Sequence, residues 1–222
     1  MVKIKICGMT NAEDALACAR ADADYLGYVF SPGSKRFVQP DAAAALVARV
    51  RSEFPQIFHV GVFVDQDISH VLDAAEQARL DVVQLHGSES PEYCARIMAA
   101  GFLLINAFRF GAGAPMADWA VYSKADFLLC DTYDPSQAGG TGHAFDRCLM
   151  PPDFPLERAF VAGGLNPDSV GNVIKLFRPY GVDVSSGVEI APGRKSRELV
   201  ARFIHEAKAA DSLPLNGDSA GW

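Results

Sequence analysis

Two residues suited to moving protons stand where strand-like segments of the sequence end. Cys7 follows the apolar run Val2–Ile6, and Asp131 closes the otherwise apolar run Phe127–Asp131. A thiolate can remove a proton, and a protonated carboxyl group can donate one. Cys7 could equally be inert core filler, because free cysteines are commonly buried. Asp131 could instead cap a loop or coordinate a ligand, so the surrounding elements must decide.

Glycine and serine residues follow the last two strand-like runs. Gly163 and Gly164 come after one run, and Ser185, Ser186 and Gly187 come after the other. Glycine lets backbone N–H groups approach an anion closely, and barrel enzymes often bind phosphate after their last two strands. Two ordinary turns are the alternative. We favour a phosphate site because both turns occur together.

Two further segments have the composition of anion-binding loops. Arg36 lies in the basic segment Ser31–Phe37, where its guanidinium could bind a carboxylate through two hydrogen bonds. The alternative is a solvated surface pair with Lys35. Gly139 and Gly140 begin the segment GGTGHAF, which is typical of a mobile lid or an anion-binding loop.

The elements that must position these residues alternate regularly along the chain. Eight strand-like runs occur, most of them followed by a helical pattern: Val2–Ile6, Ala23–Phe30, Ile57–Val64, Asp81–Leu85, Phe102–Phe108, Phe127–Asp131, Arg158–Ala162 and Val182–Ser185. This alternation predicts an α/β fold, a single compact (β/α)8 TIM barrel over 1–210, with a loose tail over 211–222. A doubly wound sheet is the alternative.

Helix starts and short helices are also predicted from local signals. Thr10 and Glu13 have the spacing of a capping box, and Asn166-Pro167 is typical of an N-cap followed by proline at the first helical position. The sixth helix, near Phe145–Met150, is expected to be short.

Alternation along the strands assigns side chains to two faces of the barrel wall. Lys3, Lys5 and Cys7 share the inward face of the first run, and Asp183 faces inward from the last run. The first and last strands of a closed barrel are neighbours, and a buried lysine needs a partner. We therefore predict an ion pair between Lys5 and Asp183, structural rather than catalytic.

Composition limits the classes of protein that this chain can represent. The net charge of −7 and the pI of about 5.2 argue against a nucleic acid partner and against anionic membranes. No run approaches the ~18 apolar residues of a membrane span, and no signal peptide is visible. The cysteines are odd in number without a C-x-x-C pair, and the histidines are scattered. We expect a cytoplasmic protein without a metal site.

Seven segments in order resemble the phosphoribosylanthranilate isomerases of tryptophan biosynthesis. They are KICGMTNAEDA, GYVFSPGSKRFV, VGVFVD, VQLHG, CDTYDPSQAGGTGHAFD, VAGGLNPDSV and GVDVSSGVE. The resemblance extends to about Ala209 and implies an Amadori rearrangement without metal or cofactor. The substrate would be N-(5-phosphoribosyl)anthranilate and the product 1-(o-carboxyphenylamino)-1-deoxyribulose 5-phosphate. We expect a monomer or a homodimer whose partner is a small phosphorylated substrate.

The resemblance also implies roles for individual residues. Cys7 would be the base, Asp131 the acid and Arg36 the group that meets the anthranilate carboxylate, while the glycines after the last two strands would hold the phosphate. The sequence departs from the family pattern at His143 and Arg147, where lysine and tryptophan are usual. A third departure is Asn106, which stands where lysine is common.

Three other functions are compatible with the same architecture. Another sugar-phosphate isomerase or epimerase would tend to use paired carboxylates with a metal, and a Schiff-base aldolase would need a lysine near the top of the barrel. Lys5 lies too low and Lys124 precedes its strand. A non-catalytic phosphosugar-binding regulator needs the phosphate loops but neither Cys7 nor Asp131. The presence of both residues favours the enzyme.

Overall fold

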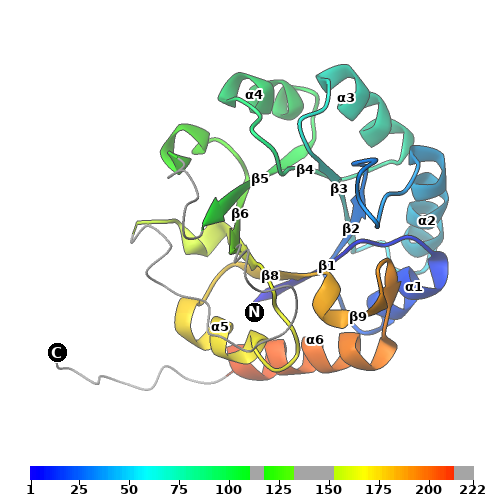
Figure 1. Cartoon of the computed structure of the whole chain (residues 1–222), viewed down its shortest axis with the longest axis vertical. Helices are drawn as coiled ribbons and strands as arrows, with labels where there is room; N and C mark the ends of the chain where they lie inside the picture. The colour runs from blue at the N-terminus through cyan, green and yellow to red at the C-terminus, as the bar shows by residue number, and fades with distance from the viewer. Residues whose placement is uncertain (111–117, 133–152, 213–222) are drawn as a thin grey trace.

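The computed structural model describes residues 1–110, 118–132 and 153–212, and the structural statements that follow concern those ranges. Parallel strands β1 to β8 pair in chain order, and β1 pairs again with β8, so the sheet closes (Figure 1). Their bounds are Lys3–Cys7, Tyr25–Val29, Phe58–Phe63, Val82–Leu85, Leu103–Phe110, Phe127–Thr132, Ala159–Ala162 and Gly181–Val184. The predicted TIM barrel is confirmed, and closure excludes the doubly wound alternative.

Helices surround the barrel and shield its outer face (Figure 1). The α-helices α1 to α6 span Ala12–Arg20, Pro40–Glu53, Ile68–Gln77, Pro91–Ala99, Val170–Phe177 and Arg197–Asp211. Short 3-10 turns η1, η3 and η4 span Trp119–Tyr122, Leu156–Arg158 and Ser186–Val188. After β8 the chain forms a small antiparallel hairpin of β9 (Glu189–Ala191) and β10 (Arg194–Lys195).

Side chains on the two faces of the strands pack into two separate apolar cores. One is a small cluster inside the barrel: Tyr25, Val60, Val82, Ile105, Leu129, Phe160 and Ala162. The larger cluster lies between strands and helices and includes Cys130 on β6 and the buried stripe of α5. Each fully buried Val, Leu, Ile or Phe side chain contributes about 1.5–3 kcal/mol to folding. On β6, Leu129 accordingly packs inside the barrel and Cys130 packs against the helices.

The predicted ion pair closes the barrel where its first and last strands meet. Lys5 and Asp183 are partners in the β1–β8 register, and Lys5 Nζ donates to Asp183 Oδ2 over 2.7 Å. Both side chains are buried. Stranding either charge in that environment is costly, so the pair fixes the alignment of β1 with β8.

The predicted capping box at the start of α1 is wrong by one residue. Asn11 is the N-cap, and its Oδ1 accepts a hydrogen bond from the Asp14 backbone N–H at 2.8 Å. Asn11 Nδ2 in turn donates to Asp14 Oδ2. Thr10 does not cap the helix, because its side chain is directed to the hairpin after β8, where its hydroxyl donates to the Gly193 carbonyl at 2.6 Å.

The proline after Asn166 also stands in a turn rather than in the first turn of a helix. Asn166 Oδ1 accepts from the backbone N–H groups of Asp168 and Ser169, and α5 begins only at Val170. The side chain thus stabilises a separate turn, which carries the chain from the end of β7 to α5.

The C-terminal helix fastens the chain end to its beginning. The backbone N–H of Val2 donates to Asp211 Oδ2 at 2.8 Å, and α6 itself runs to Asp211. The helix expected near Phe145–Met150 and most of the expected tail, 213–222, lie outside the described residues. Within the described ranges, no helix combines the length and the apolar character that crossing a membrane requires.

Candidate active site

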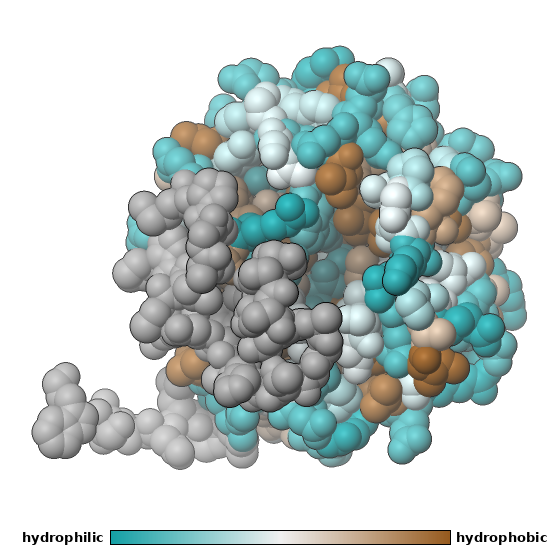
Figure 2. Space-filling view, in the orientation of Figure 1, coloured by the Kyte–Doolittle hydropathy of each residue, from teal (hydrophilic) through white to brown (hydrophobic). Residues whose placement is uncertain are grey.

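The carboxyl ends of the parallel strands gather the candidate residues at one end of the barrel. Viewed along the barrel, the middle of the molecule is recessed, with hydrophilic residues in and around the hollow (Figure 2). Cys7 ends β1 and Asp131 lies near the end of β6. Strands β7 and β8 separate them on one side and β2 to β5 on the other. The two residues therefore lie on different walls of the barrel, at the same open end, its mouth.

Cys7 is enclosed, and the backbone around it is built to make room for its side chain. A Cβ atom on Gly27, its partner on β2, would lie 2.7 Å from Cys7 Sγ. Gly8 turns the chain away with φ +86°, and a Cβ there would lie 2.6 Å from Arg36 Cδ. Burial raises the pKa of the Cys7 thiol, while the positive charges of Lys5 and Lys195 act in the opposite direction.

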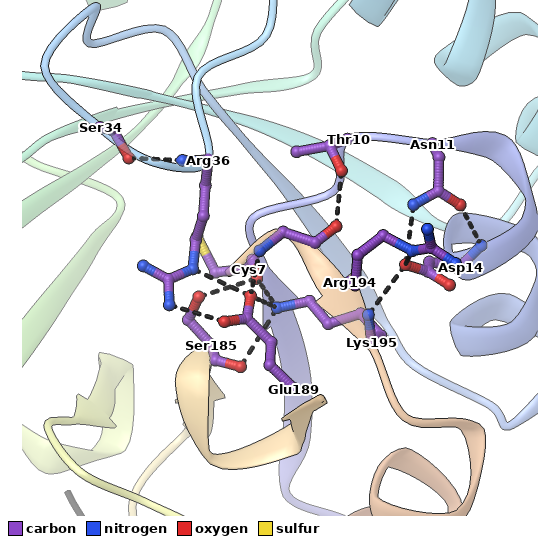
Figure 3. A network of polar contacts seen from close by, with 11 residues as sticks. Cys7, Thr10, Asn11, Asp14, Ser34, Arg36, Ser185, Glu189, Arg194 and Lys195 are labelled. Atoms are coloured by element: carbon purple, nitrogen blue, oxygen red, sulfur yellow. Dashed lines mark hydrogen bonds and ion pairs between the residues drawn. The ribbon is translucent and has the colours of Figure 1, made fainter. Parts of the chain in front are cut away.

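Arg36 reaches this wall from the loop after β2 and is held by a carboxylate of the chain itself. Its Nε and Nη2 atoms donate to the two carboxylate oxygens of Glu189 at 2.9 and 2.6 Å (Figure 3). Lys195 Nζ donates to the same carboxylate at 2.7 Å. Burial alone would raise the pKa of Glu189, but the hydrogen bonds from Arg36 and Lys195 outweigh it and lower that pKa. The surface-pair interpretation of Arg36 is therefore wrong.

Sequence reasoning missed both Glu189 and Lys195. Glu189 ends the segment GVDVSSGVE that carried part of the resemblance, but 153 residues separate it from Arg36. Lys195 lies in a two-residue strand with no periodic pattern. The available signal was a lone carboxylate shortly after the last barrel strand, at the end of a segment that carried part of the resemblance.

Asp131 is more open than Cys7 and meets a histidine. Its side chain is 26% exposed, and its Oδ2 lies 3.1 Å from His86 Nε2. Gln84 Nε2 lies 3.0 Å from the other ring nitrogen of His86. Since an amide nitrogen donates, His86 Nδ1 accepts, and its Nε2–H donates to Asp131. His86 directly follows β4, and no role was predicted for it from the sequence.

The two glycine turns after β7 and β8 meet each other beside Cys7. Gly163 and Gly164 have φ values of +93° and +63°, the left-handed region that glycine adopts readily. A Cβ on Gly187 would lie 1.9 Å from the Leu165 carbonyl oxygen, so the loops pack too closely for any side chain there. Ser185 Oγ donates to the Cys7 carbonyl at 3.1 Å, and Ser186 is exposed.

Several predicted features lie elsewhere or outside the described residues. Gly139, Gly140, His143 and Arg147 all fall in the undescribed segment 133–152. In the part of the chain that the structure describes, no three His, Cys, Asp or Glu side chains are grouped as metal ligands would be. A cavity of about 250 Å³ lies on the outer surface between α4 and η1, away from the mouth.

Comparison with known proteins identifies the family. The family model described as N-(5'phosphoribosyl)anthranilate (PRA) isomerase matches residues 4–206. The chain belongs to the N-(5'-phosphoribosyl)anthranilate isomerase family. A relative with that name from Geobacter sp. strain M21 is 44% identical over 208 residues, covering 94% of this chain and 98% of the relative. A relative from Thiobacillus denitrificans is 43% identical over 210 residues, covering 94% and 99%.

Solved structures of the family share the fold. The phosphoribosyl anthranilate isomerase of Thermotoga maritima is 38% identical with a TM-score of 0.80, covering 94% of this chain and 100% of that one. A family structure in complex with reduced 1-(o-carboxyphenylamino)-1-deoxyribulose 5-phosphate is 37% identical with a TM-score of 0.74, again covering 94% and 100%. The resemblance drawn from seven sequence segments is thus confirmed at the level of the family.

Proposed function

We propose that this chain is the isomerase of tryptophan biosynthesis that converts N-(5-phosphoribosyl)anthranilate into 1-(o-carboxyphenylamino)-1-deoxyribulose 5-phosphate. The observation that carries the proposal is the pairing of family membership with a mouth that presents a thiol and a carboxyl group from different walls. A regulator that only binds phosphosugars would need neither group. The match to the two relatives named as isomerases also covers nearly their whole length.

The reaction requires two proton transfers on one sugar. An acid first protonates the ribose ring oxygen, the bond from that oxygen to carbon 1 breaks, and the anilino nitrogen shares its lone pair to give an iminium ion. A base then removes the proton on carbon 2, and the released electron pair neutralises the nitrogen to give an enolamine. Tautomerisation of the enolamine yields the ketone, so acid and base on opposite sides of the substrate suffice.

Cys7 serves as the base in this proposal. At neutral pH an ordinary cysteine, with a pKa of ~8.5, is only about 3% thiolate. Burial raises the pKa of Cys7 further, against the charges of Lys5 and Lys195. Ring opening places a positive iminium group beside the thiol, and a neighbouring cation favours the thiolate. Cys7 is therefore deprotonated most readily when the intermediate that needs a base has formed.

Asp131 serves as the acid, with His86 as its support. Once Asp131 has given its proton to the ring oxygen, the carboxylate that remains can accept the hydrogen bond from His86 Nε2–H. A charge-assisted bond of this kind is stronger than a neutral one and stabilises the charged form. Partial exposure of Asp131 gives solvent a route to restore the proton between turnovers.

The anionic ends of the substrate are assigned to the remaining groups. Arg36 is assigned to the anthranilate carboxylate. Glu189 contacts its Nε and Nη2 atoms, so Nη1 is not used by that contact and can donate to the substrate. The phosphate is assigned to backbone N–H groups of the two turns and to the exposed Ser186 hydroxyl: Gly163, Gly164, Ser185, Ser186 and Gly187. Ser185 contributes only its backbone N–H, because its hydroxyl donates to the Cys7 carbonyl. Gly139 and Gly140, which the sequence suggests for a lid or an anion-binding loop, lie outside the described residues.

The oligomeric state and the compartment also remain predictions. A T. maritima structure is described as monomers of a dimeric enzyme, at 38% identity and a TM-score of 0.77. We therefore propose either a monomer or a homodimer for this chain. A cytoplasmic location follows from the cysteine pattern alone.

A fluorescence assay tests the proposed function directly. The anthranilate conjugate is added to the purified protein, and its conversion is followed with time. We expect catalytic turnover that greatly exceeds one substrate per protein molecule. Stoichiometric binding without turnover would support the phosphosugar-binding regulator instead. A borohydride-trapped adduct with a sugar phosphate would support a Schiff-base aldolase.

A further inference from the structure

The hairpin that follows the last barrel strand returns to the mouth and places a buried ammonium group beside the backbone of Cys7. The Lys195 side chain is 1% exposed. Its Nζ donates to three oxygens: Cys7 O at 2.6 Å, Glu189 Oε1 at 2.7 Å and Ser185 O at 3.1 Å (Figure 3). An ammonium has three protons, so these contacts use its whole donor capacity.

The hairpin is fastened to the start of α1, so the position of Lys195 does not depend on the two short strands alone. The backbone N–H of Lys195 donates to Asp14 Oδ2 at 2.8 Å, the same oxygen that Asn11 Nδ2 contacts. Thr10 Oγ1 donates to the Gly193 carbonyl in the hairpin turn. Figure 3 shows these contacts converging beside the loop after β1.

Lys195 joins two neighbouring strand ends, those of β1 and β8, beyond the point where the sheet pairs them with each other. The β1–β8 ladder ends at Ile6 and Val184, one residue before Cys7 and Ser185. The ammonium binds both of the following carbonyl oxygens and so fixes the backbone that carries the Cys7 thiol. It also adds a positive charge close to that thiol, where a thiolate would form.

Glu189 extends the same network to Arg36. Its carboxylate accepts from Lys195 and, through both oxygens, from the Arg36 guanidinium. Two parallel hydrogen bonds fix the plane of a guanidinium as well as its position. Glu189 is itself buried, with its side chain 5% exposed, so its orientation is set by the packing around it.

We propose that Lys195 is a positioning residue for Cys7 and that Glu189 is a positioning residue for Arg36. Together they form an ionic brace between the base and the carboxylate-binding group. The inference rests on the proposed function, which assigns those two roles to Cys7 and Arg36. Neither Lys195 nor Glu189 needs to touch the reacting atoms, because each acts through the residue that it holds.

The pH at which Cys7 reacts gives a readout that a merely structural role would not move. The charged groups that face the thiol are Lys5 on β1, Asp183 on β8, Lys195 on β10 and Arg36 from the loop after β2. Burial raises the pKa of Cys7, and Lys195 lowers it. Removing the Lys195 charge must therefore raise that pKa further, and the thiolate must form only at higher pH.

The first test compares Lys195→Met and Lys195→Gln with Arg194→Met, a control on the same hairpin whose side chain is 61% exposed. For Lys195→Met we expect kcat to fall roughly tenfold or more while KM changes little, since small misplacements of catalytic groups carry penalties of this order. Lys195→Gln keeps a donor for the carbonyls but loses the charge. It should recover part of kcat.

The same variants are then alkylated with iodoacetamide across a pH series, with Cys7 followed by peptide mass spectrometry. Both Lys195 variants should need higher pH for the same alkylation rate, and Arg194→Met should match the wild type. Identical pH curves and identical kcat for the Lys195 and Arg194 variants would overturn the brace. Failure of both Lys195 variants to fold, judged by circular dichroism, would reject a positioning role in favour of a folding one.

The second test uses Glu189→Gln, which should show the opposite division of effects. Lys195 keeps its two carbonyl partners, so kcat should remain close to the wild-type value. Arg36 loses its bidentate partner, so KM should rise several-fold. An unchanged KM would remove Glu189 from the inference. Alkylation needs no substrate, so absence of wild-type turnover would count against the proposed function and leave the Lys195 test of Cys7 intact.

Discussion

The wall that carries Cys7 and the wall that carries Asp131 hold their reactive groups in different ways. Cys7 lies among buried charges, with the Lys5–Asp183 pair below it and Lys195 and Glu189 beside it. Asp131 is partly exposed, and in the described part of the chain its carboxylate contacts a single histidine. One wall is closed and ionic, and the other is open to solvent.

The difference suits the chemistry proposed for each group. A base that is protonated for most of the time gains from fixed positive charges, because they stabilise the thiolate without any reorganisation. An acid must recover its proton after each turnover, and exposure to water and to His86 provides for that. The closed wall therefore supplies electrostatics, whereas the open wall supplies proton exchange.

The largest effect is expected from Cys7→Ser, which removes the base and leaves the closed wall intact. A serine hydroxyl ionises far less readily than a thiol, so kcat should fall by about 10³-fold or more, with KM little changed. Steady-state fluorescence turnover checks this. Cys18→Ala is the matched control, because Cys18 is buried on α1 outside the barrel. Turnover near the wild-type rate in Cys7→Ser would remove Cys7 as the base.

Lys5→Met tests the buried charges of the same wall through stability. It leaves Asp183 without its partner, and breaking a buried pair in this way typically costs about 3–5 kcal/mol of unfolding free energy. Urea unfolding measures the loss. The double variant Lys5→Met/Asp183→Leu should recover part of it, since neither charge then remains. A single variant as stable as the wild type would show that the pair does not support this wall.

Asp131→Asn tests the open wall and should be less severe than Cys7→Ser. The acid is lost, yet His86 and solvent remain as slower proton donors, so we expect kcat to fall by roughly 10²-fold. The variant should still bind the reduced product, which isothermal titration can measure. A normal rate would remove the acid role of Asp131 and leave the open wall without a catalytic group.

The smallest effect is expected from His86→Gln, which changes only the support of the acid. Glutamine can still donate a hydrogen bond to the Asp131 carboxylate, but a weaker one. We therefore expect kcat to fall by about threefold to tenfold, the effect of weakening one hydrogen bond to a charged group. Gln84→Leu, which frees the other ring nitrogen, should reproduce a part of that loss. A fall as large as that of Asp131→Asn would instead make His86 the acid.

The sequence predicted the barrel and the Lys5–Asp183 pair because both depend on regular patterns. Apolar runs locate the strands, alternation gives each residue a face, and closure makes the first and last strands neighbours. No comparable pattern exists for Glu189 and Lys195, which sit in strands of three and two residues. Their contacts with Arg36 and Cys7 depend on where a hairpin folds back, which spacing alone does not determine.

The hairpin also explains why the N-cap of α1 was predicted one residue too early. Thr10 has the right type and spacing for a cap, but its side chain is directed to the hairpin, where it donates to the Gly193 carbonyl, and Asn11 caps the helix instead. Asp131 was expected at a strand end, but its contact with His86 emerges only when β4 and β6 are placed around the barrel.

A crystal structure of this chain with reduced 1-(o-carboxyphenylamino)-1-deoxyribulose 5-phosphate tests the central claim most directly. The account predicts that the ligand lies in the mouth, with Cys7 Sγ and the Asp131 carboxylate on opposite sides of its sugar chain and both within hydrogen-bond reach of it. A ligand bound elsewhere, or either side chain turned away from the sugar, would contradict the account.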